Sequence, residues 1–282
     1  MRRFRISLCN EVLGKLPFVR QCALAAALGY DGLELAPFTL DPEPASLGLA
    51  KRRALRRTAE REGIAITGLH WLLTVPKGLS ITTDDPALRA RTVAHIEAMI
   101  ELCADLGGEV LVHGSPEQRR LADASGPQAA RDNATVVLAC AAEAAQRAGV
   151  VYCLEPLSPE LTDFATNIEE AASIVRAVGS PHLATMIDTS AAWAGETEEP
   201  DALIRRHLPT GLLRHVHLND TNRRAPGQGE HGFLPVIRAL ADGGYKGVVG
   251  VEPFDYHPDG ATAAAMALGY LNGLLEQTER TP

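Results

Sequence analysis

Four residues of the types that bind metal ions each follow or end a separate apolar, strand-like run: Glu155, Asp188, His217 and Glu252. If these runs are parallel strands of one α/β barrel, the four side chains meet at the barrel mouth where such folds place their chemistry. Three carboxylates and one imidazole offer mostly oxygen ligands, which suit a divalent cation such as Mn²⁺ or Mg²⁺. Ionised carboxylates gathered there would repel one another unless a cation or a proton offset the repulsion. The sequence therefore predicts a divalent-metal site.

Each of the four residues also has an ordinary structural explanation. A carboxylate at a strand end is often a helix cap or an ion-pair partner, and Asp188, followed by Thr189 and Ser190, could begin a turn. His215 lies two residues before His217 on the same strand face, so one of the two could be a core histidine. It is the joint pattern, rather than any single residue, that favours the metal.

Short β-type runs alternate with longer helical patterns along the whole chain. The predicted strands are residues 4–9, 32–36, 64–70, 109–113, 150–155, 183–188, 213–218 and 247–252. The predicted helices are residues 16–28, 44–62, 85–106, 127–148, 167–178, 201–207, 234–242 and 260–275. Such alternation requires parallel pairing with right-handed crossovers. Eight repeats predict a closed (β/α)8 barrel, the TIM barrel.

No stretch of the chain has the composition of a linker between domains. Proline, glycine and serine are not concentrated in any one segment, and no low-complexity tract interrupts the alternation. We therefore expect residues 1–282 to form one α/β domain. The long segments 71–84 and 219–232 are expected to be loops on the catalytic face.

Composition narrows the class of protein further. The chain has 282 residues and a formal net charge of -8, which disfavours a nonspecific nucleic-acid binder and favours a small-molecule partner. No apolar run has the length of a secretory signal or a membrane span, so we expect a cytoplasmic protein without a membrane partner. Five cysteines lie scattered without CxxC spacing, which predicts buried free thiols rather than a zinc site or a disulfide framework.

Five short motifs surround the four residues. They are Leu154-Glu155-Pro156-Leu157, Ile187-Asp188-Thr189, His215-Val216-His217-Leu218-Asn219-Asp220, Arg223-Arg224-Ala225-Pro226-Gly227-Gln228-Gly229 and Gly250-Val251-Glu252-Pro253-Phe254. In these motifs and over nearly the whole barrel, the chain resembles the xylose isomerase-like superfamily of sugar isomerases and epimerases. The nearest group is that of D-tagatose 3-epimerase and related ketose 3-epimerases, whose Glu, Asp, His, Glu metal set has the same order and similar spacing.

The resemblance implies roles for the four residues. In the family the two glutamates bind the metal and exchange protons with the substrate, so Glu155 and Glu252 are expected to be catalytic, with Asp188 and His217 as ligands only. The cation is expected to be Mn²⁺, with Mg²⁺ or Co²⁺ as alternatives. It would stabilise an enediolate formed from a ketose, while two carboxylates on opposite sides of the substrate invert one carbon. Homo-oligomers are common in the family, so a homo-oligomer is possible here.

Five further residues are candidate substrate contacts. Arg223 matches an arginine that reaches substrate oxygens in the epimerases, although it could be a solvated surface residue. His113 and Glu34 end predicted strands, where core packing and a structural salt bridge are the competing explanations. His70 and Trp71 would offer a hydrogen-bonding group and an apolar platform for a sugar face, although Trp71 could simply pack beneath the next loop.

Three departures from the epimerase pattern leave the substrate open. Ala191 stands where the ketose 3-epimerases carry a substrate-binding histidine. Leu161 replaces a glutamate, with Glu160 one position earlier, and Asp220 stands where glutamate is common. The identity of the sugar is therefore not predicted.

Several other activities use the same scaffold. Hydroxypyruvate isomerisation, dehydration of an inosose and cleavage of C-glycosides all begin with loss of a proton next to a carbonyl, so the same residues fit each of them. A sugar-binding barrel without catalysis is a further alternative. An AP endonuclease-like phosphodiesterase is disfavoured, because it needs more metal ligands and a basic DNA groove. A phosphorylated substrate is also less favoured, since no glycine-rich phosphate cradle follows a strand.

Overall fold

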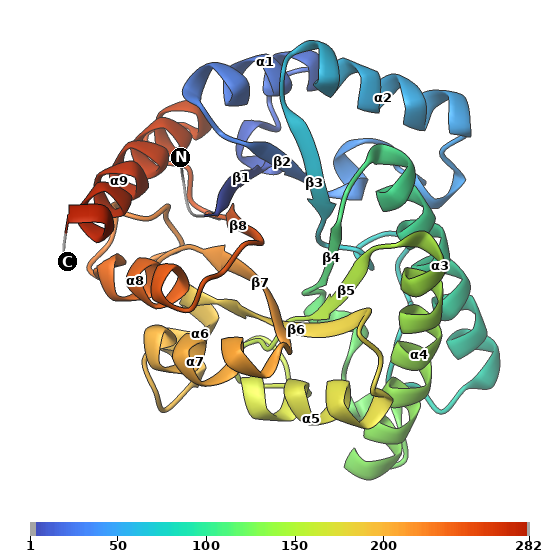
Figure 1. The fold of residues 1–282 in the computed structure, drawn as a ribbon. Helices are drawn as coiled ribbons and strands as arrows, with labels where there is room; N and C mark the ends of the chain where they lie inside the picture. Colours follow the sequence, from blue (N-terminus) through green and yellow to red (C-terminus); the bar gives the residue numbers. More distant parts are fainter. Residues whose placement is uncertain (1–3, 281–282) are drawn as a thin grey trace.

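The chain forms a closed barrel of parallel strands, seen end-on in Figure 1. A computed structural model describes residues 4–280. The strands are β1 (Arg5–Cys9), β2 (Gly32–Leu35), β3 (Ala65–Leu69), β4 (Val110–His113), β5 (Val151–Leu154), β6 (Leu183–Asp188), β7 (Leu213–Leu218) and β8 (Val248–Val251). Each strand pairs in parallel with the next, and β8 pairs with β1 to close the ring. The predicted TIM barrel is confirmed, with every predicted strand present to within one or two residues.

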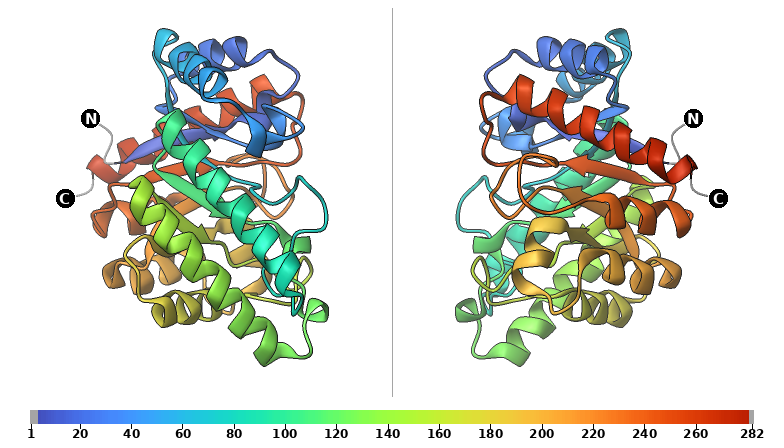
Figure 2. Two further views of the ribbon diagram at one scale, coloured as in Figure 1. Left: turned by 90° about the vertical axis from the view of Figure 1, so that its right-hand side faces the viewer. Right: turned by 90° about the vertical axis from the view of Figure 1, so that its left-hand side faces the viewer.

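An outer layer of helices surrounds the strands (Figures 1 and 2). The helices are α1 (Phe18–Leu28), α2 (Leu49–Arg61), α3 (Pro86–Leu106), α4 (Pro127–Ala148), α5 (Ile168–Val178), α6 (Thr189–Gly195), α7 (Pro200–His207), α8 (Leu234–Asp242) and α9 (Gly260–Arg280). The long helices α3 and α4 lie side by side on one flank (Figure 2). Three predictions differ from the structure, the first being that α9 continues to Arg280, five residues beyond its predicted end. Residues 44–48 are a short 3-10 turn and a glycine rather than the start of α2, and α6 was not predicted.

Local sequence signals explain the helix boundaries. The side chain of Asp85 accepts a hydrogen bond from the backbone N–H of Ala87, and Pro86 occupies the first position of α3, where its missing N–H costs nothing. The same helix ends at Gly107, whose φ of 88° lies in the left-handed region. The sequence therefore specifies both ends of helix α3.

Most of the apolar side chains lie between the strands and the helices. Leu8, Leu33, Leu154 and Val216 are among the strand residues in this main core, and each buried leucine of this kind stabilises the fold by about 1.5–3 kcal/mol. A second, small apolar cluster on β4, β5 and β6 contains Val110, Val112, Cys153, Ala184 and Met186. Side chains alternate between the two faces of a strand, so one strand supplies residues both to the helix-facing core and to the barrel interior.

Two expectations from composition are addressed by the structure. Within residues 4–280, no helix is both long enough and apolar enough to cross a bilayer. All five cysteines are free thiols. Four of them are buried as expected. Cys140, on α4, is only partly buried and is not among the buried residues of that helix.

Candidate metal centre and active site

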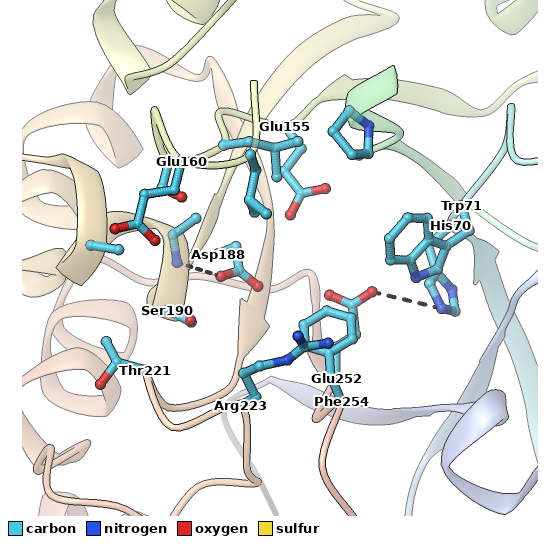
Figure 3. Close-up of a pocket in the computed structure, with 17 residues that line it drawn as sticks. His70, Trp71, Glu155, Glu160, Asp188, Ser190, Thr221, Arg223, Glu252 and Phe254 are labelled. Carbon is cyan, nitrogen blue, oxygen red and sulfur yellow. Dashed lines mark hydrogen bonds and ion pairs between the residues drawn. The ribbon is translucent and has the colours of Figure 1, made fainter. Parts of the chain in front are cut away.

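The four predicted metal ligands come together at one mouth of the barrel. Glu155 directly follows β5, Asp188 ends β6, His217 lies in β7 and Glu252 directly follows β8. Each offers one ligand atom, and these atoms lie within 4.8 Å of one another. All four residues are buried. Figure 3 shows the carboxylates of Glu155, Asp188 and Glu252 facing a common space.

The electrostatics of this cluster fit a divalent cation. Burial, and then the negative charges of Glu252 and Asp188, raise the pKa of Glu155 to about 8. Burial and Glu252 raise the pKa of Asp188 to about 6. In both cases burial is the largest cause, and the charges of neighbouring carboxylates add to it. A divalent cation held by three carboxylates and one imidazole would balance those charges.

A polar network fixes the orientation of Asp188. Its Oδ1 accepts a hydrogen bond from the backbone N–H of Ala191 at 2.7 Å, which caps α6, and its Oδ2 accepts one from Asn219 Nδ2 at 2.8 Å. The same amide nitrogen donates to the carbonyl oxygen of Glu252 at 3.0 Å. Asp188 is thus a helix cap as well as a member of the cluster. Asn219, which was not among the predicted site residues, connects β6 to the loop after β8.

Glu34 lies beneath the cluster rather than in the substrate cavity. Its two oxygens are each 3.0 Å from a histidine Nε2, one from His217 and one from His215. Burial alone would raise the pKa of Glu34, but these two histidines hold it well below its usual value. By holding Nε2, Glu34 orients His217 so that Nδ1 lies 2.9 Å from Glu252 Oε2. The structure therefore favours the salt-bridge explanation of Glu34.

His113 is also outside the cavity. It pairs with Leu154, a member of the main apolar core, so its side chain lies on the helix-facing side of the barrel. His113 Nδ1 lies 2.8 Å from the hydroxyl of Tyr152. Burial and the nearby charge of Arg119 hold the pKa of His113 well below its usual value, so the imidazole is neutral. The core-packing explanation fits this position.

The other three predicted substrate contacts line a cavity of about 320 Å³ that opens onto the cluster. Figure 3 shows His70 and Trp71 on one side of this cavity and Arg223 beside Phe254 and Glu252. The backbone of Arg223 has a φ of 68°, and its guanidinium lies 5.5 Å from the ring centre of Phe254. A charged group thus reaches the cavity beside an aromatic surface.

Much of the remaining wall is apolar. Leu157, Leu161, Ala191, Ala194 and Phe254 all contribute to it, together with Pro116. Glu160 also lines this cavity, close to the position where the ketose 3-epimerases place a glutamate. The cavity therefore combines a carboxylate-rich floor with a mixed wall, which suits a small molecule that has both polar oxygens and an apolar face.

A comparison with known protein families agrees with the barrel fold. The family model described as xylose isomerase-like TIM barrel matches residues 22–273. This chain belongs to that family. The resemblance inferred from the sequence motifs is confirmed.

Several of the similar proteins are named as sugar epimerases. D-psicose 3-epimerase of Agrobacterium fabrum is 28% identical over 234 residues, covering 81% of this chain and 76% of the relative. Fructoselysine 3-epimerase of Shigella flexneri is 24% identical over 275 residues, covering 94% and 96%. The solved structure of an L-ribulose 3-epimerase matches with a TM-score of 0.82 at 21% identity, covering 98% of this chain and 96% of that one, which supports the fold.

Two residues of this xylose isomerase-like barrel shape the site without having been predicted. A Cβ atom at Gly114 would lie 1.8 Å from Glu155 Oε2, so only glycine leaves room for that carboxylate. Arg119 is fully buried, and its guanidinium donates to the carbonyl oxygens of Glu155 at 2.6 Å, of Ser115 at 3.3 Å and of His113. In the sequence, Arg119 stands beside Arg120 in a polar segment and resembles a surface charge.

Metal affinity is expected to rise with pH. Glu155, with a pKa of about 8, carries a proton at lower pH, and Glu252 and Glu34 raise the pKa of His217 well above its usual value despite its burial. A cation must displace these protons, so Mn²⁺ affinity should increase by up to about tenfold per pH unit for each proton released. Titration calorimetry between pH 6 and about 8, in buffers of different ionisation enthalpy, would count the protons released. Affinity that is constant over this interval would contradict the expectation.

Proposed function

We propose that this chain is a divalent-metal-dependent sugar isomerase or epimerase. Its substrate would be a small ketose or keto-sugar, and the reaction would pass through a cis-enediolate. The observation that carries the proposal is the convergence of Glu155, Asp188, His217 and Glu252 on the floor of a cavity that Arg223 also reaches. Relationship to D-psicose and fructoselysine 3-epimerases supports the choice of sugar chemistry.

Glu155, Asp188, His217 and Glu252 would hold the cation, with Mn²⁺ as the best candidate and Mg²⁺ or Co²⁺ as alternatives. When bound, the cation would polarise the substrate carbonyl and make the neighbouring C–H more acidic. Glu252 and Glu155 approach the cavity from β8 and β5, two strands that are not neighbours in the barrel. One carboxylate would remove the proton from one face of the carbon, and the other would return a proton to the opposite face, which inverts the stereocentre.

The residues of the cavity wall favour one class of sugar substrate over another. Ala191 lines the wall where the ketose 3-epimerases have a substrate-binding histidine, and Leu161 and Glu160 line it nearby. The loss of one polar contact and the gain of apolar surface favour a sugar that makes fewer hydrogen bonds on this side than a free hexulose does.

Proton NMR in D₂O tests the proposal directly. The Mn²⁺-loaded or Mg²⁺-loaded chain would be incubated with a panel of ketoses, inososes and 3-keto-glycosides. We expect loss of the signal from the carbon next to the carbonyl, and this loss should disappear when the metal is chelated. The product then distinguishes epimerisation, isomerisation and elimination. Full metal occupancy without exchange in any member of the panel would contradict the proposal.

Arg223 is expected to contribute mainly to substrate binding. Replacing it with Ala removes a charge-assisted hydrogen bond worth about 1.5–3 kcal/mol, which corresponds to a rise in KM of about 10- to 100-fold. Arg224→Ala is a matched control, because the adjacent Arg224 is ion-paired with Asp255 at 2.8 Å and does not line the cavity. Steady-state kinetics on the substrate found by NMR would give KM and kcat for both variants. Equal KM values in the two variants would refute the assigned contact.

A further inference from the structure

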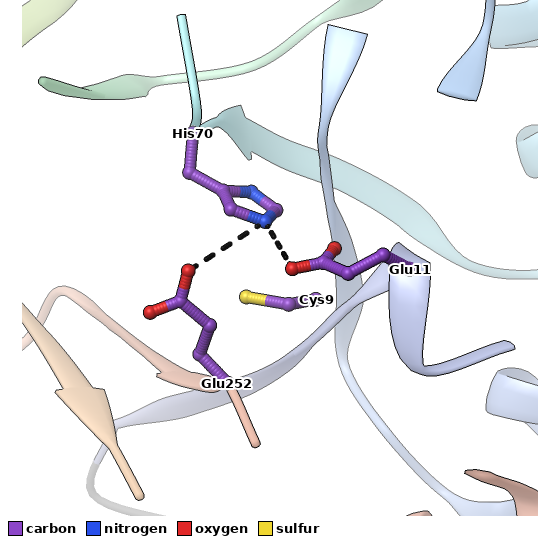
Figure 4. A group of neighbouring side chains, drawn as sticks. All are labelled: Cys9, Glu11, His70 and Glu252. Atoms are coloured by element: carbon purple, nitrogen blue, oxygen red, sulfur yellow. Dashed lines mark hydrogen bonds and ion pairs between the residues drawn. The ribbon is translucent and has the colours of Figure 1, made fainter. Parts of the chain in front are cut away.

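A second group of ligand-type side chains lies beside the first centre. It consists of Cys9, Glu11, His70 and Glu252, drawn in Figure 4, and their ligand atoms lie within 4.8 Å of one another. We propose that this group binds a second divalent cation, of the softer class that includes Zn²⁺, Co²⁺ and Fe²⁺, with Glu252 shared between the two centres.

The barrel topology brings these residues together from three strand ends. Cys9 is the last residue of β1, and Glu11 lies in the 3-10 turn Asn10–Leu13 that follows it. His70 directly follows β3, and Glu252 directly follows β8, which pairs with β1. The site is therefore built on rigid strand ends and a short turn rather than on a long loop.

Two donor atoms in this group have no protein partner. Cys9 is fully buried, and its thiol forms no hydrogen bond with the residues that the structure describes. Figure 4 shows its sulfur pointing into the space between Glu11, His70 and Glu252. Glu11 Oε2 is likewise buried and without a hydrogen bond in the described part of the chain. Buried polar groups are normally paired, so an unpaired buried thiol that points into the space between three ligand-type side chains indicates a ligand there.

The two carboxylate oxygens of Glu252 face different groups. Its Oε2 lies 2.9 Å from His217 Nδ1 in the first centre, while its Oε1 lies 3.8 Å from His70 Nε2 in the second. One oxygen therefore faces each group, which is the arrangement of a carboxylate that bridges two cations about 3.5–4 Å apart.

Charge balance also favours a second cation. Five carboxylates surround the two groups: Glu11, Glu34, Glu155, Asp188 and Glu252. Glu34 is paired with His215 and His217, which leaves four carboxylates, and one divalent cation would offset the charge of two of them. His70 Nε2 lies 2.8 Å from Glu11 Oε1, so an imidazole and a carboxylate that already adjoin each other would both be ligands of the second cation.

Ligand chemistry distinguishes the two centres. The first offers three carboxylates and one imidazole, whereas the second offers a thiol, an imidazole and two carboxylates. Thiolate and imidazole select Zn²⁺, Co²⁺ or Fe²⁺ over Mg²⁺ or Mn²⁺, and a bound cation deprotonates the thiol. A second cation would also hold Glu252 in a fixed orientation at the cavity floor.

Cobalt titration of the chelator-treated full chain tests the proposal. We expect two Co²⁺ per chain by elemental analysis, together with a near-ultraviolet thiolate-to-cobalt charge-transfer band. Cys9→Ser should abolish the band. Cys22→Ser should keep it, because Cys22 is an equally buried thiol on α1 outside the group. Asp188→Asn, which alters a ligand of the first centre only, should also keep the band.

Two results would overturn the second site: a single Co²⁺ per chain with no charge-transfer band, or a band that persists in Cys9→Ser. If Cys9→Ser does not fold, His70→Ala and Glu11→Gln test the second site instead. Each variant should bind one Co²⁺ fewer per chain than the unmodified protein. These readouts do not depend on turnover. A band without proton exchange on any sugar would therefore refute the proposed function while supporting the second site.

Discussion

Replacing Glu252 with Gln should lower the rate of substrate proton exchange by about 10²- to 10⁴-fold, the usual contribution of a positioned general base. The amide has nearly the shape of the carboxylate but cannot accept the proton. Asn219 still reaches the backbone carbonyl of residue 252, so the loop after β8 should keep its position. The rate would be measured by NMR in D₂O at saturating Mn²⁺, with metal content and circular dichroism recorded in parallel.

Glu230→Gln is the matched control for this substitution, because Glu230 is exposed in the loop after β7 and does not line the cavity. Its exchange rate should equal that of the unmodified chain. If Glu252→Gln retains its metal and its fold but exchanges within tenfold of the unmodified chain, Glu252 is not a proton-transfer residue. Glu155→Gln, tested in the same way, would then show whether Glu155 is the residue that transfers the substrate proton.

Replacing Arg119 with Met is expected to lower the free energy of unfolding by about 3–5 kcal/mol. Methionine keeps the buried stem of the side chain but leaves the carbonyls of His113, Ser115 and Glu155 without their donor. Each unsatisfied buried group costs about 1–3 kcal/mol, and the release of the guanidinium from a buried position offsets part of the sum. Urea unfolding of the metal-free chain would measure the change.

Arg120→Met provides the comparison for Arg119→Met, because Arg120 is the neighbouring arginine and is exposed. Its effect should lie within about 0.5 kcal/mol of zero. The two variants unfolding at the same urea concentration would show that Arg119 does not hold the loops after β4 and β5 together. Turnover should fall in Arg119→Met as well, since the backbone that carries Glu155 loses its support.

The main features of the fold were predictable because each depends on a local pattern. Apolar runs mark the strands, and acidic or histidine residues at the ends of β5 to β8 lie where parallel strands must converge. Helix α6 was missed because it has only 7 residues and begins at Asp188, whose side chain caps it. The residue whose side chain caps that helix is also one of the proposed metal ligands.

Other parts of the site depend on how neighbouring strands pair. The sequence of one strand does not specify that pairing. The depth of Glu34 in the barrel follows from its pairing with Cys9 and Gly68, and this places it below His217 rather than in the cavity. His113 pairs with Leu154, so the next residue, Gly114, lies beside Glu155. The burial of Arg119 had no sequence signal, since its partners are backbone carbonyls.

The backbone of Arg223 has a consequence for how this barrel could acquire new substrates. Its carbonyl oxygen accepts hydrogen bonds from the backbone N–H groups of Phe254 and Asp255, both at 2.8 Å, so the segments after β7 and β8 are held together. Leu161 lines another part of the cavity wall, and it is 59% exposed. We therefore expect substitutions around Leu161, rather than in the two joined segments, to alter the cavity wall without moving Arg223, which makes the loop after β5 the natural place to select altered substrate preference.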